Sequence, residues 1–149
     1  MKTLSTFAIS LLGVVMITAG ASQLALAQEK TALQKDRNAQ MKVLGRSMGQ
    51  LKKASDTASM QAPAAAIAAA TKKLGEMWPA GSGGSATRAK AEVWSNMGDF
   101  KAKLGAMQSA ADALIKASAG SDLGAAKKAF GGVGRTCGGC HKVYRGPKF

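Results

Sequence analysis

The chain has 149 residues, a length that fits a single domain. Its hydrophobic fraction of 46% excludes a disordered basic tail, although 21 Lys and Arg against 8 Asp and Glu give a net charge of +13. Two cysteines and one histidine exclude a zinc site with four Cys and His ligands. Any catalytic site that pairs a histidine with Ser or Cys would have to use that one histidine.

The N-terminus has the three regions of a secretory signal peptide. Lys2 supplies a positive start, residues 11–17 form an apolar core, and Ala25-Leu26-Ala27 is a cleavage signal of the A-x-A type. We therefore expect cleavage to remove residues 1–27 and to leave a mature domain of residues 28–149. The alternative is an uncleaved membrane anchor, but polar and small residues make the apolar run short for a bilayer span. These residues are Thr18, Gly20, Ser22 and Gln23.

Export changes what the basic composition implies. An exported protein does not meet chromosomal DNA, so we expect no nucleic-acid partner. We expect the mature chain in the periplasm, with no stable membrane insertion once the signal peptide is gone. Lys2 is the only charged residue of the predicted signal peptide, so the mature chain is one unit less positive. Outside the cytosol two free cysteines would oxidise, so they must form a disulfide or carry a group.

Four segments of the mature chain predict helices, over residues 29–53, 59–77, 87–119 and 123–145. Ala, Lys, Leu and Gln dominate them, and these residues favour helix. Apolar residues recur at steps of three and four, which is one face of a helix. These stripes are Met41, Leu44, Met48 and Leu51 in the first; Val93, Met97, Phe100, Leu104, Met107, Ala111 and Leu114 in the third; and Leu123, Ala126, Phe130, Val133, Cys137, Cys140 and Tyr144 in the fourth.

The connections between these segments contain typical helix-ending and capping residues. The run Trp78-Pro79-Ala80-Gly81 ends the second helix, Gly120 ends the third, and Ser121 or Asp122 can cap the fourth. Short connections make neighbouring helices antiparallel. The sequence therefore predicts an all-α fold, an up-down-up-down four-helix bundle.

The motif Cys137-Gly138-Gly139-Cys140-His141 has the spacing of c-type haem attachment. Two thiols three residues apart on a helix can each bond one vinyl group of the same porphyrin. His141 follows the second cysteine directly, so its imidazole can reach the iron as the proximal ligand. We therefore expect one covalently attached haem c near the C-terminal helix.

Three other uses of the cysteines deserve comparison. A thioredoxin-like redox pair needs a βαβ context, which this chain lacks. Half a zinc site needs a second pair of ligands, and the sequence has none. An exported helical binding module without haem, with a Cys137–Cys140 disulfide, is the alternative from a different functional class, and it would show no Soret band.

The placement of this motif near the end of the last of four helices resembles class II cytochromes c, the cytochrome c′ family. Other segments are similar to that family in the same order along the chain, and together they cover essentially the whole mature chain. They are residues 37–48 with the pattern Arg-x-x-x-Met-Lys-x-x-Gly-Arg-x-Met, residues 74–81 with Trp-Pro-Ala-Gly, residues 93–100 with Val-Trp-Ser-Asn-Met, and residues 132–145 with the haem motif and Tyr-Arg.

The resemblance implies a role for each matching residue. Cys137 and Cys140 would hold the haem, and His141 would bind the iron. Arg37 would reach a haem propionate, and Arg145, one turn after His141, would lie near the proximal ligand. An ordinary solvated charge is the alternative for both arginines, and Trp94 and Tyr144 are expected to be packing residues.

The same resemblance places Met41 at the distal side of the iron, where the family has two branches. In the low-spin branch a methionine binds the iron and the protein carries electrons without being an enzyme. In the high-spin branch the iron is five-coordinate and binds small gases such as nitric oxide, and a methionine there only packs. The pattern around Met41, with Lys42, Gly45, Arg46 and Met48, resembles the low-spin branch more closely. We therefore expect His/Met ligation, with gas binding as the alternative.

Charge is unevenly distributed along the chain and bears on the partner. The last predicted helix and the residues after it carry no acidic residue and six basic ones: Lys127, Lys128, Arg135, Lys142, Arg145 and Lys148. Such a surface would steer an acidic redox partner protein, whereas the alternative is a generally basic exported surface. The resemblance also leaves a homodimer open.

Overall fold

The computed structural model describes residues 17–84 and 86–148, and their side chains from Ala32 onward. Its helices are α1 (Ile17–Lys53), α2 (Ala58–Gly75), α3 (Glu92–Ser95), α4 (Met97–Ser118) and α5 (Leu123–Tyr144). Of the predicted signal peptide, residues 1–16 lie outside the described residues. No helix within the described ranges is both long and apolar enough to cross a membrane.

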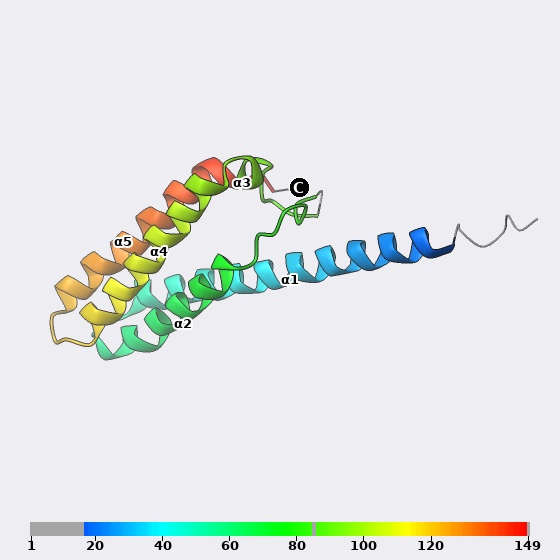
Figure 1. Ribbon diagram of the computed structural model, residues 1–149. Helices are drawn as coiled ribbons and strands as arrows, with labels where there is room; N and C mark the ends of the chain where they lie inside the picture. Colours follow the sequence, from blue (N-terminus) through cyan, green and yellow to red (C-terminus); the bar gives the residue numbers. More distant parts are fainter. Residues whose placement is uncertain (1–16, 85, 149) are drawn as a thin grey trace, which may run out of the picture.

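Helix α1 begins earlier than the sequence predicts. It starts at Ile17 instead of residue 29 and continues through Ala27 without a break. The intervening residues are rich in Ala, Leu and Gln and contain no proline, so no residue there ends the helix. Its first part extends beyond the other helices, as Figure 1 shows. Cleavage after Ala27 stays a prediction.

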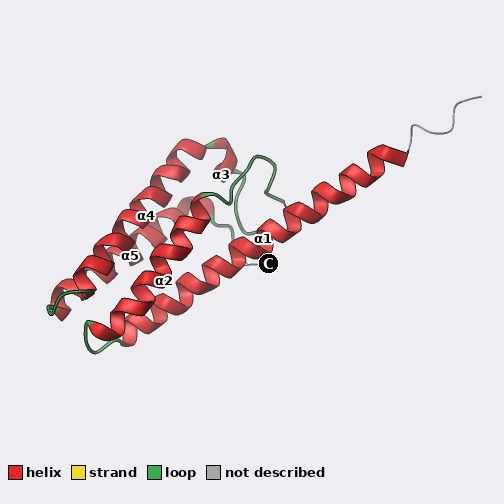
Figure 2. Ribbon diagram, turned by 60° about the horizontal axis from the view of Figure 1, so that its bottom comes forward, coloured by secondary structure: helices red, strands yellow, loops and turns green. Residues whose placement is uncertain are grey.

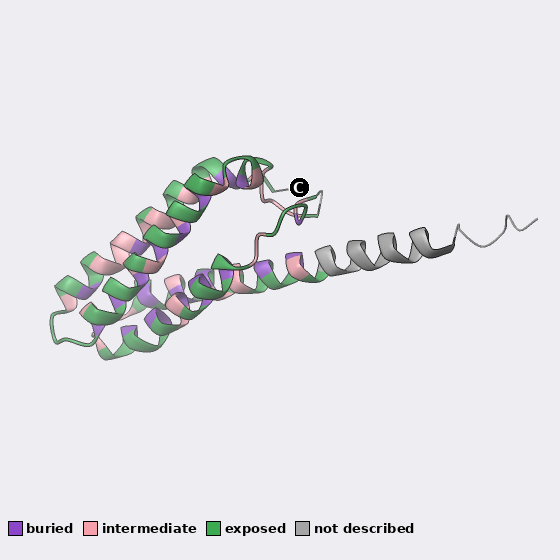
Figure 3. Cartoon of the chain, in the orientation of Figure 1, coloured by how far each residue is buried: buried purple, intermediate pink, exposed green. Residues whose placement is uncertain are grey.

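The four long helices form two hairpins. Helices α1 and α2 pack side by side, as do α4 and α5, and α2 contacts α4 across the bundle (Figure 1). The hairpins lie together at the end with the short connections and separate toward the end where α3 and the connection 76–91 lie (Figure 2). Buried residues line the inner faces of all four long helices (Figure 3). The predicted four-helix bundle is confirmed.

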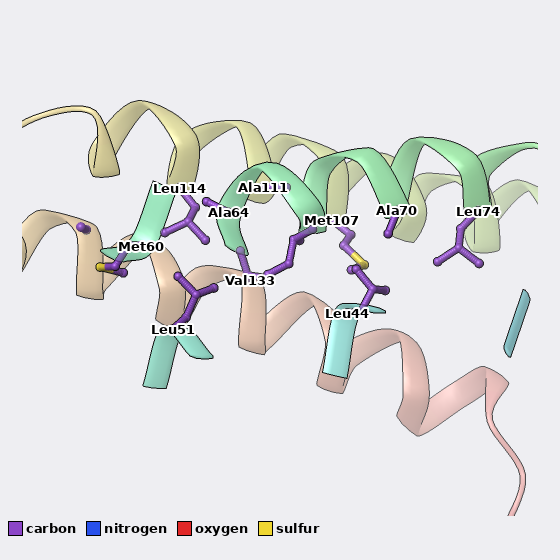
Figure 4. Packing of buried hydrophobic residues seen from close by; sticks show 12 residues of the cluster. Leu44, Leu51, Met60, Ala64, Ala70, Leu74, Met107, Ala111, Leu114 and Val133 are labelled. Carbon is purple, nitrogen blue, oxygen red and sulfur yellow. The ribbon is translucent and has the colours of Figure 1, made fainter. Parts of the chain in front are cut away.

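The main core fills the end at which the hairpins meet. Leu51 of α1, Met60 of α2, Leu114 of α4 and Val133 of α5 are almost completely buried there (Figure 4). Leu51, Leu114 and Val133 belong to predicted apolar stripes, and Met60 lies at the start of the second predicted helix. The stripes therefore face one another as their periodicity predicts, and burial of these side chains stabilises the bundle.

The third predicted helix differs from the structure at its beginning. Residues 87–91 are not helical, and Asn96, with φ −128° and ψ 46°, separates α3 from α4. The reason is long-range backbone pairing with the C-terminal tail. The amide of Lys90 donates to the carbonyl of Tyr144 at 3.0 Å, and the amide of Gly146 donates to the carbonyl of Arg88 at 2.7 Å. This pairing uses backbone groups that a helix would need for itself.

Helix α5 begins and ends close to its predicted limits. Asp122 is its N-cap residue, and its carboxylate accepts a hydrogen bond of 3.0 Å from the amide of Ala125. Cys137 and Cys140 lie on its inward-facing stripe but are only half-buried. Both pack against the core and also line a cavity.

Candidate functional site

A cavity of about 470 Å³ opens where the two hairpins separate. Its walls come from α1, α4, α5 and the connection 76–91, and most of its lining is apolar. This volume lies in the usual range for cofactor sites, about 300–1,000 Å³. All the site residues predicted from the sequence line it: Arg37, Met41, Cys137, Cys140, His141 and Arg145.

Helix α5 presents the haem motif to this cavity. Neither Cys137 nor Cys140 forms a disulfide within the described part of the chain, and burial raises the pKa of both thiols. Burial also lowers the pKa of His141, and the positive charges of Arg145 and Arg88 lower it further. Both effects favour the neutral form of His141, in which an imidazole nitrogen can bind a metal. Over residues 17–84 and 86–148 no three His, Cys, Asp or Glu side chains gather into a site for a bare metal ion.

Helix α1 forms the opposite wall. Met41 lies one turn after Arg37, and both side chains line the cavity. Two further methionines, Met48 of α1 and Met107 of α4, line it as well. The site thus holds one imidazole on α5 and three thioethers on the facing walls.

Arg37 is a buried cation at this wall, with only 3% of its surface exposed. One NH2 group donates to the carbonyl of Ser82, and the guanidinium lies 4.6 Å from the ring centroid of Trp78. Its Nε and the other terminal nitrogen have no hydrogen-bond partner among the described residues. Leaving buried donors unpaired costs about 1–3 kcal/mol each. A carboxylate in the cavity, such as a haem propionate, would accept a charge-assisted hydrogen bond from this guanidinium.

Gln34 is a further site residue that sequence analysis missed. It is buried, and its Nε2 donates to the carbonyl of Gly83 at 2.7 Å. With Arg37 it binds α1 to the connection that covers this wall. A Cβ at position 83 would lie 3.0 Å from the Trp94 ring, so the ring would have to shift for any residue larger than glycine. The spacing of Gln34 and Arg37, three residues apart on one helix face, was the available sequence signal.

Arg88 was missed as well, and it lies on the His141 side of the cavity. Its Nε and NH2 donate to the carbonyl of Gly146 at 3.0 and 2.8 Å, and Nε also lies 3.0 Å from the carbonyl of Pro147. Arg145 is exposed, and its backbone amide donates to the carbonyl of His141 at 3.2 Å. Two arginines, Arg88 and Arg145, therefore lie near the C-terminal end of α5. The sequence analysis indicated only Arg145.

The expectation that Trp94 and Tyr144 are packing residues agrees with their positions. Phe100 joins the aromatic cluster of this end, with its ring centroid 5.1 Å from Tyr144 and 4.8 Å from Trp78. Trp94 packs beside Trp78 at 6.2 Å, and its Nε1 donates to the carbonyl of Pro79 at 2.9 Å. Trp78, Phe100 and Tyr144 of this cluster line the cavity, and Trp94 packs beside Trp78 outside the lining.

A family model and individual relatives match this chain to the same protein family. The family model described as Cytochrome C′ matches residues 28–145. A cytochrome c′ of Pararhodospirillum photometricum is 42% identical over 83 residues, which are 55% of this chain and 66%, just under two thirds, of that protein. A cytochrome c-556 of Agrobacterium fabrum is 34% identical over 115 residues, which are 73% of this chain and 77% of that protein.

Solved structures extend the similarity to the fold. Cytochrome c prime from Shewanella frigidimarina superposes with a TM-score of 0.74 at 31% identity, covering 79% of this chain and 97% of that chain. A nitric oxide complex of a mutant cytochrome c prime from Alcaligenes xylosoxidans superposes with a TM-score of 0.73 at 26% identity, covering 80% and 97%.

Proposed function

Because the chain belongs to the cytochrome c′ family, we propose that it is an exported electron carrier whose iron is bound by His141 and Met41. Proteins of this family carry covalently attached c-type haem, and the chain has two cysteines for the attachment. The observation that supports the proposal is the shared cavity, which is lined by both cysteines and His141 of α5 and by Met41 of α1.

Helix α5 supplies the attachment. We assign Cys137 and Cys140 to the two thioether bonds and His141 to the proximal position. A side chain at position 138 or 139 would meet no neighbour within 4 Å, so the protein itself does not require the two glycines between the cysteines. The helix surface is therefore open where the thioethers form. The Arg145 amide donates to the His141 carbonyl and so closes the last turn of the helix beyond the ligand.

Helix α1 supplies the distal side. Met41 is the cavity methionine one turn from Arg37, and the proposed propionate contact of Arg37 fixes the haem edge beside it. When bound, the haem supplies a reversible one-electron iron couple, and His/Met ligation raises its potential. The cavity contains no Asp or Glu among its described lining residues that could act as a general base. We propose electron transfer without enzymatic turnover.

Absorption spectra of the two redox states test this proposal. We expect a six-coordinate low-spin spectrum in both, and haem that acidified acetone fails to extract. A broad high-spin spectrum would refute the Met41 ligation, and extractable haem would refute the thioether bonds. Analysis of the N-terminus of the exported protein tests cleavage after Ala27.

The second candidate function is binding of a small gas at five-coordinate iron. It is favoured by the apolar surroundings of the distal wall, where Leu44, Met48 and Met107 line the cavity without charge. A similar protein of known structure forms a nitric oxide complex. In this case the ferrous protein binds carbon monoxide or nitric oxide rapidly, and Met41 only packs.

The proposed redox partner is an acidic protein. All six basic residues of α5 and the tail that follows it have exposed side chains: Lys127, Lys128, Arg135, Lys142, Arg145 and Lys148. They lie along the helix that carries the haem motif and in the tail after it, so their field acts on a partner that approaches this face. We expect the association rate to fall as ionic strength rises. A rate independent of salt would leave only a generally basic surface.

A further inference from the structure

Two tryptophans flank the buried guanidinium of Arg37, and their indole N–H groups differ. The carbon centre of that guanidinium lies 4.6 Å from the ring centroid of Trp78 and 5.8 Å from that of Trp94. The indole N–H of Trp94 donates to the carbonyl of Pro79 at 2.9 Å. The indole N–H of Trp78 is buried and has no acceptor within the described ranges.

The two rings also differ in what they line. Trp78 lines the cavity, as does Arg37, whereas Trp94 does not. Three buried donors of these two residues therefore have no acceptor among the described residues: the indole N–H of Trp78 and the Nε and one terminal nitrogen of Arg37. Buried polar groups in folded proteins are paired with few exceptions, so three unpartnered donors on two residues whose side chains are stacked indicate a missing acceptor. An acceptor that meets a guanidinium and an indole N–H at once has the chemistry of a carboxylate.

We propose that Trp78 is a haem-binding residue whose indole N–H donates to the same propionate that Arg37 binds. This inference rests on the proposed function in one respect, namely that the cavity holds a haem. It is independent of Met41, because a propionate is present whether the iron is five- or six-coordinate. Arg37 neutralises the charge of the carboxylate, and Trp78, whose ring lies against the guanidinium, donates an additional hydrogen bond to it. The stacked pair thus acts as one preorganised anion clamp.

The variant Trp78→Phe tests the inference, because it removes the N–H and keeps an aromatic ring against Arg37 and Phe100. Trp94→Phe is the matched control, since its N–H is already bonded to a backbone carbonyl. Both holoproteins are compared by the resonance Raman bending modes of the propionates and by midpoint potential. We expect Trp78→Phe to shift one propionate mode to lower frequency and to lower the potential, because the carboxylate keeps more negative charge near the iron. Trp94→Phe should leave both unchanged.

The double variant Trp78→Phe with Arg37→Gln adds a second criterion. If both residues bind one carboxylate, their effects on the propionate mode are not additive. Additive effects, or an unchanged mode in Trp78→Phe, would overturn the inference. Covalent haem content is measured in the same samples, so absence of haem, which would refute the proposed function, is distinguished from failure of the Trp78 contact.

A structure of the wild-type holoprotein decides the matter if Trp78→Phe does not fold. An indole nitrogen within about 3.2 Å of a propionate oxygen supports the inference. An indole nitrogen bonded to water or to the protein backbone, with the propionate on Arg37 alone, contradicts it.

Discussion

The hydroxyl of Tyr144 donates a hydrogen bond of 2.5 Å to Oδ2 of Asp99 and so joins the last residue of α5 to the first turn of α4. The Tyr144 ring is buried, although the side chain of Asp99 is almost half exposed. This contact lies three residues beyond His141. It holds the end of the haem helix against the neighbouring helix, so the two walls of the cavity that meet there are connected directly.

Stability should depend on the ionisation of Tyr144. The Asp99 carboxylate, which accepts the hydrogen bond, raises the pKa of Tyr144 to about 12. A raised pKa contributes stability that is complete below the unfolded value of about 10 and is lost as the pH rises toward 12. We expect Tyr144→Phe to unfold at a lower denaturant concentration than wild type at pH 8. The difference should shrink between about pH 10 and 12, and a constant difference over that interval would contradict this assignment.

Removal of the Met41 thioether should open the sixth position of the iron. We expect Met41→Ala to convert a six-coordinate low-spin spectrum into a high-spin one and to admit carbon monoxide. Met48→Ala is the matched control, because Met48 lies on the same helix and lines the same cavity. Its spectrum should stay low-spin. Conversion by Met48→Ala and not by Met41→Ala would transfer the ligand role to Met48.

Arg37 should stabilise the holoprotein more than the protein without haem. Two of its donors lack partners among the described residues, and charge-assisted hydrogen bonds contribute about 1.5–3 kcal/mol each. We therefore expect Arg37→Gln to lower the free energy of unfolding of the holoprotein by about 2–3 kcal/mol more than that of the apoprotein. Chemical denaturation of both forms measures this difference.

The matched control for Arg37 is Gln34→Ala. Gln34 binds the same connection through Gly83 but does not line the cavity. We expect a loss of about 1 kcal/mol in both forms, since its hydrogen bond does not involve the haem. If Arg37→Gln lowered the free energy of unfolding equally with and without haem, as Gln34→Ala should, Arg37 would only hold the connection.

The C-terminal tail should loosen when Arg88 is replaced. Arg88→Ala removes the hydrogen bonds to the carbonyls of Gly146 and Pro147 beside the bridge between Ala89 and Arg145. We expect faster hydrogen exchange at the amides of Gly146 and Lys90, with little change in the core of α2. Uniform acceleration over the whole chain would indicate global destabilisation instead. Arg88→Lys should restore part of the protection because it keeps a donor.

Much of the site was predictable because the relevant signals are local. The stripe through Leu44 and Leu51 follows from the helix period alone, and their burial confirms it. Cys137, Cys140 and His141 share one short motif whose spacing carries the chemistry. The family resemblance placed Arg37 and Met41 on the facing helix, and both line the cavity with the motif.

The remaining features depend on contacts between residues far apart in the sequence. Residues 87–91 have a composition compatible with helix, yet they pair with the tail around Arg145 instead. The hydrogen bonds from Gln34 to Gly83 and from Arg88 to Gly146 join residues 49 and 58 positions apart, and no local pattern encodes them.

The sequence by itself determined the four main helices, most of their buried faces and the haem motif, because periodicity and spacing act within a few turns of one helix. Only the tertiary structure decided which donors at the cavity are satisfied. Trp78 and Trp94 are the same residue type, but the indole N–H of Trp94 donates to the carbonyl of Pro79. The indole N–H of Trp78 has no partner among the described residues. That difference arises because the connection 76–91 places the carbonyl of Pro79 beside Trp94 of α3, a contact between residues 15 positions apart.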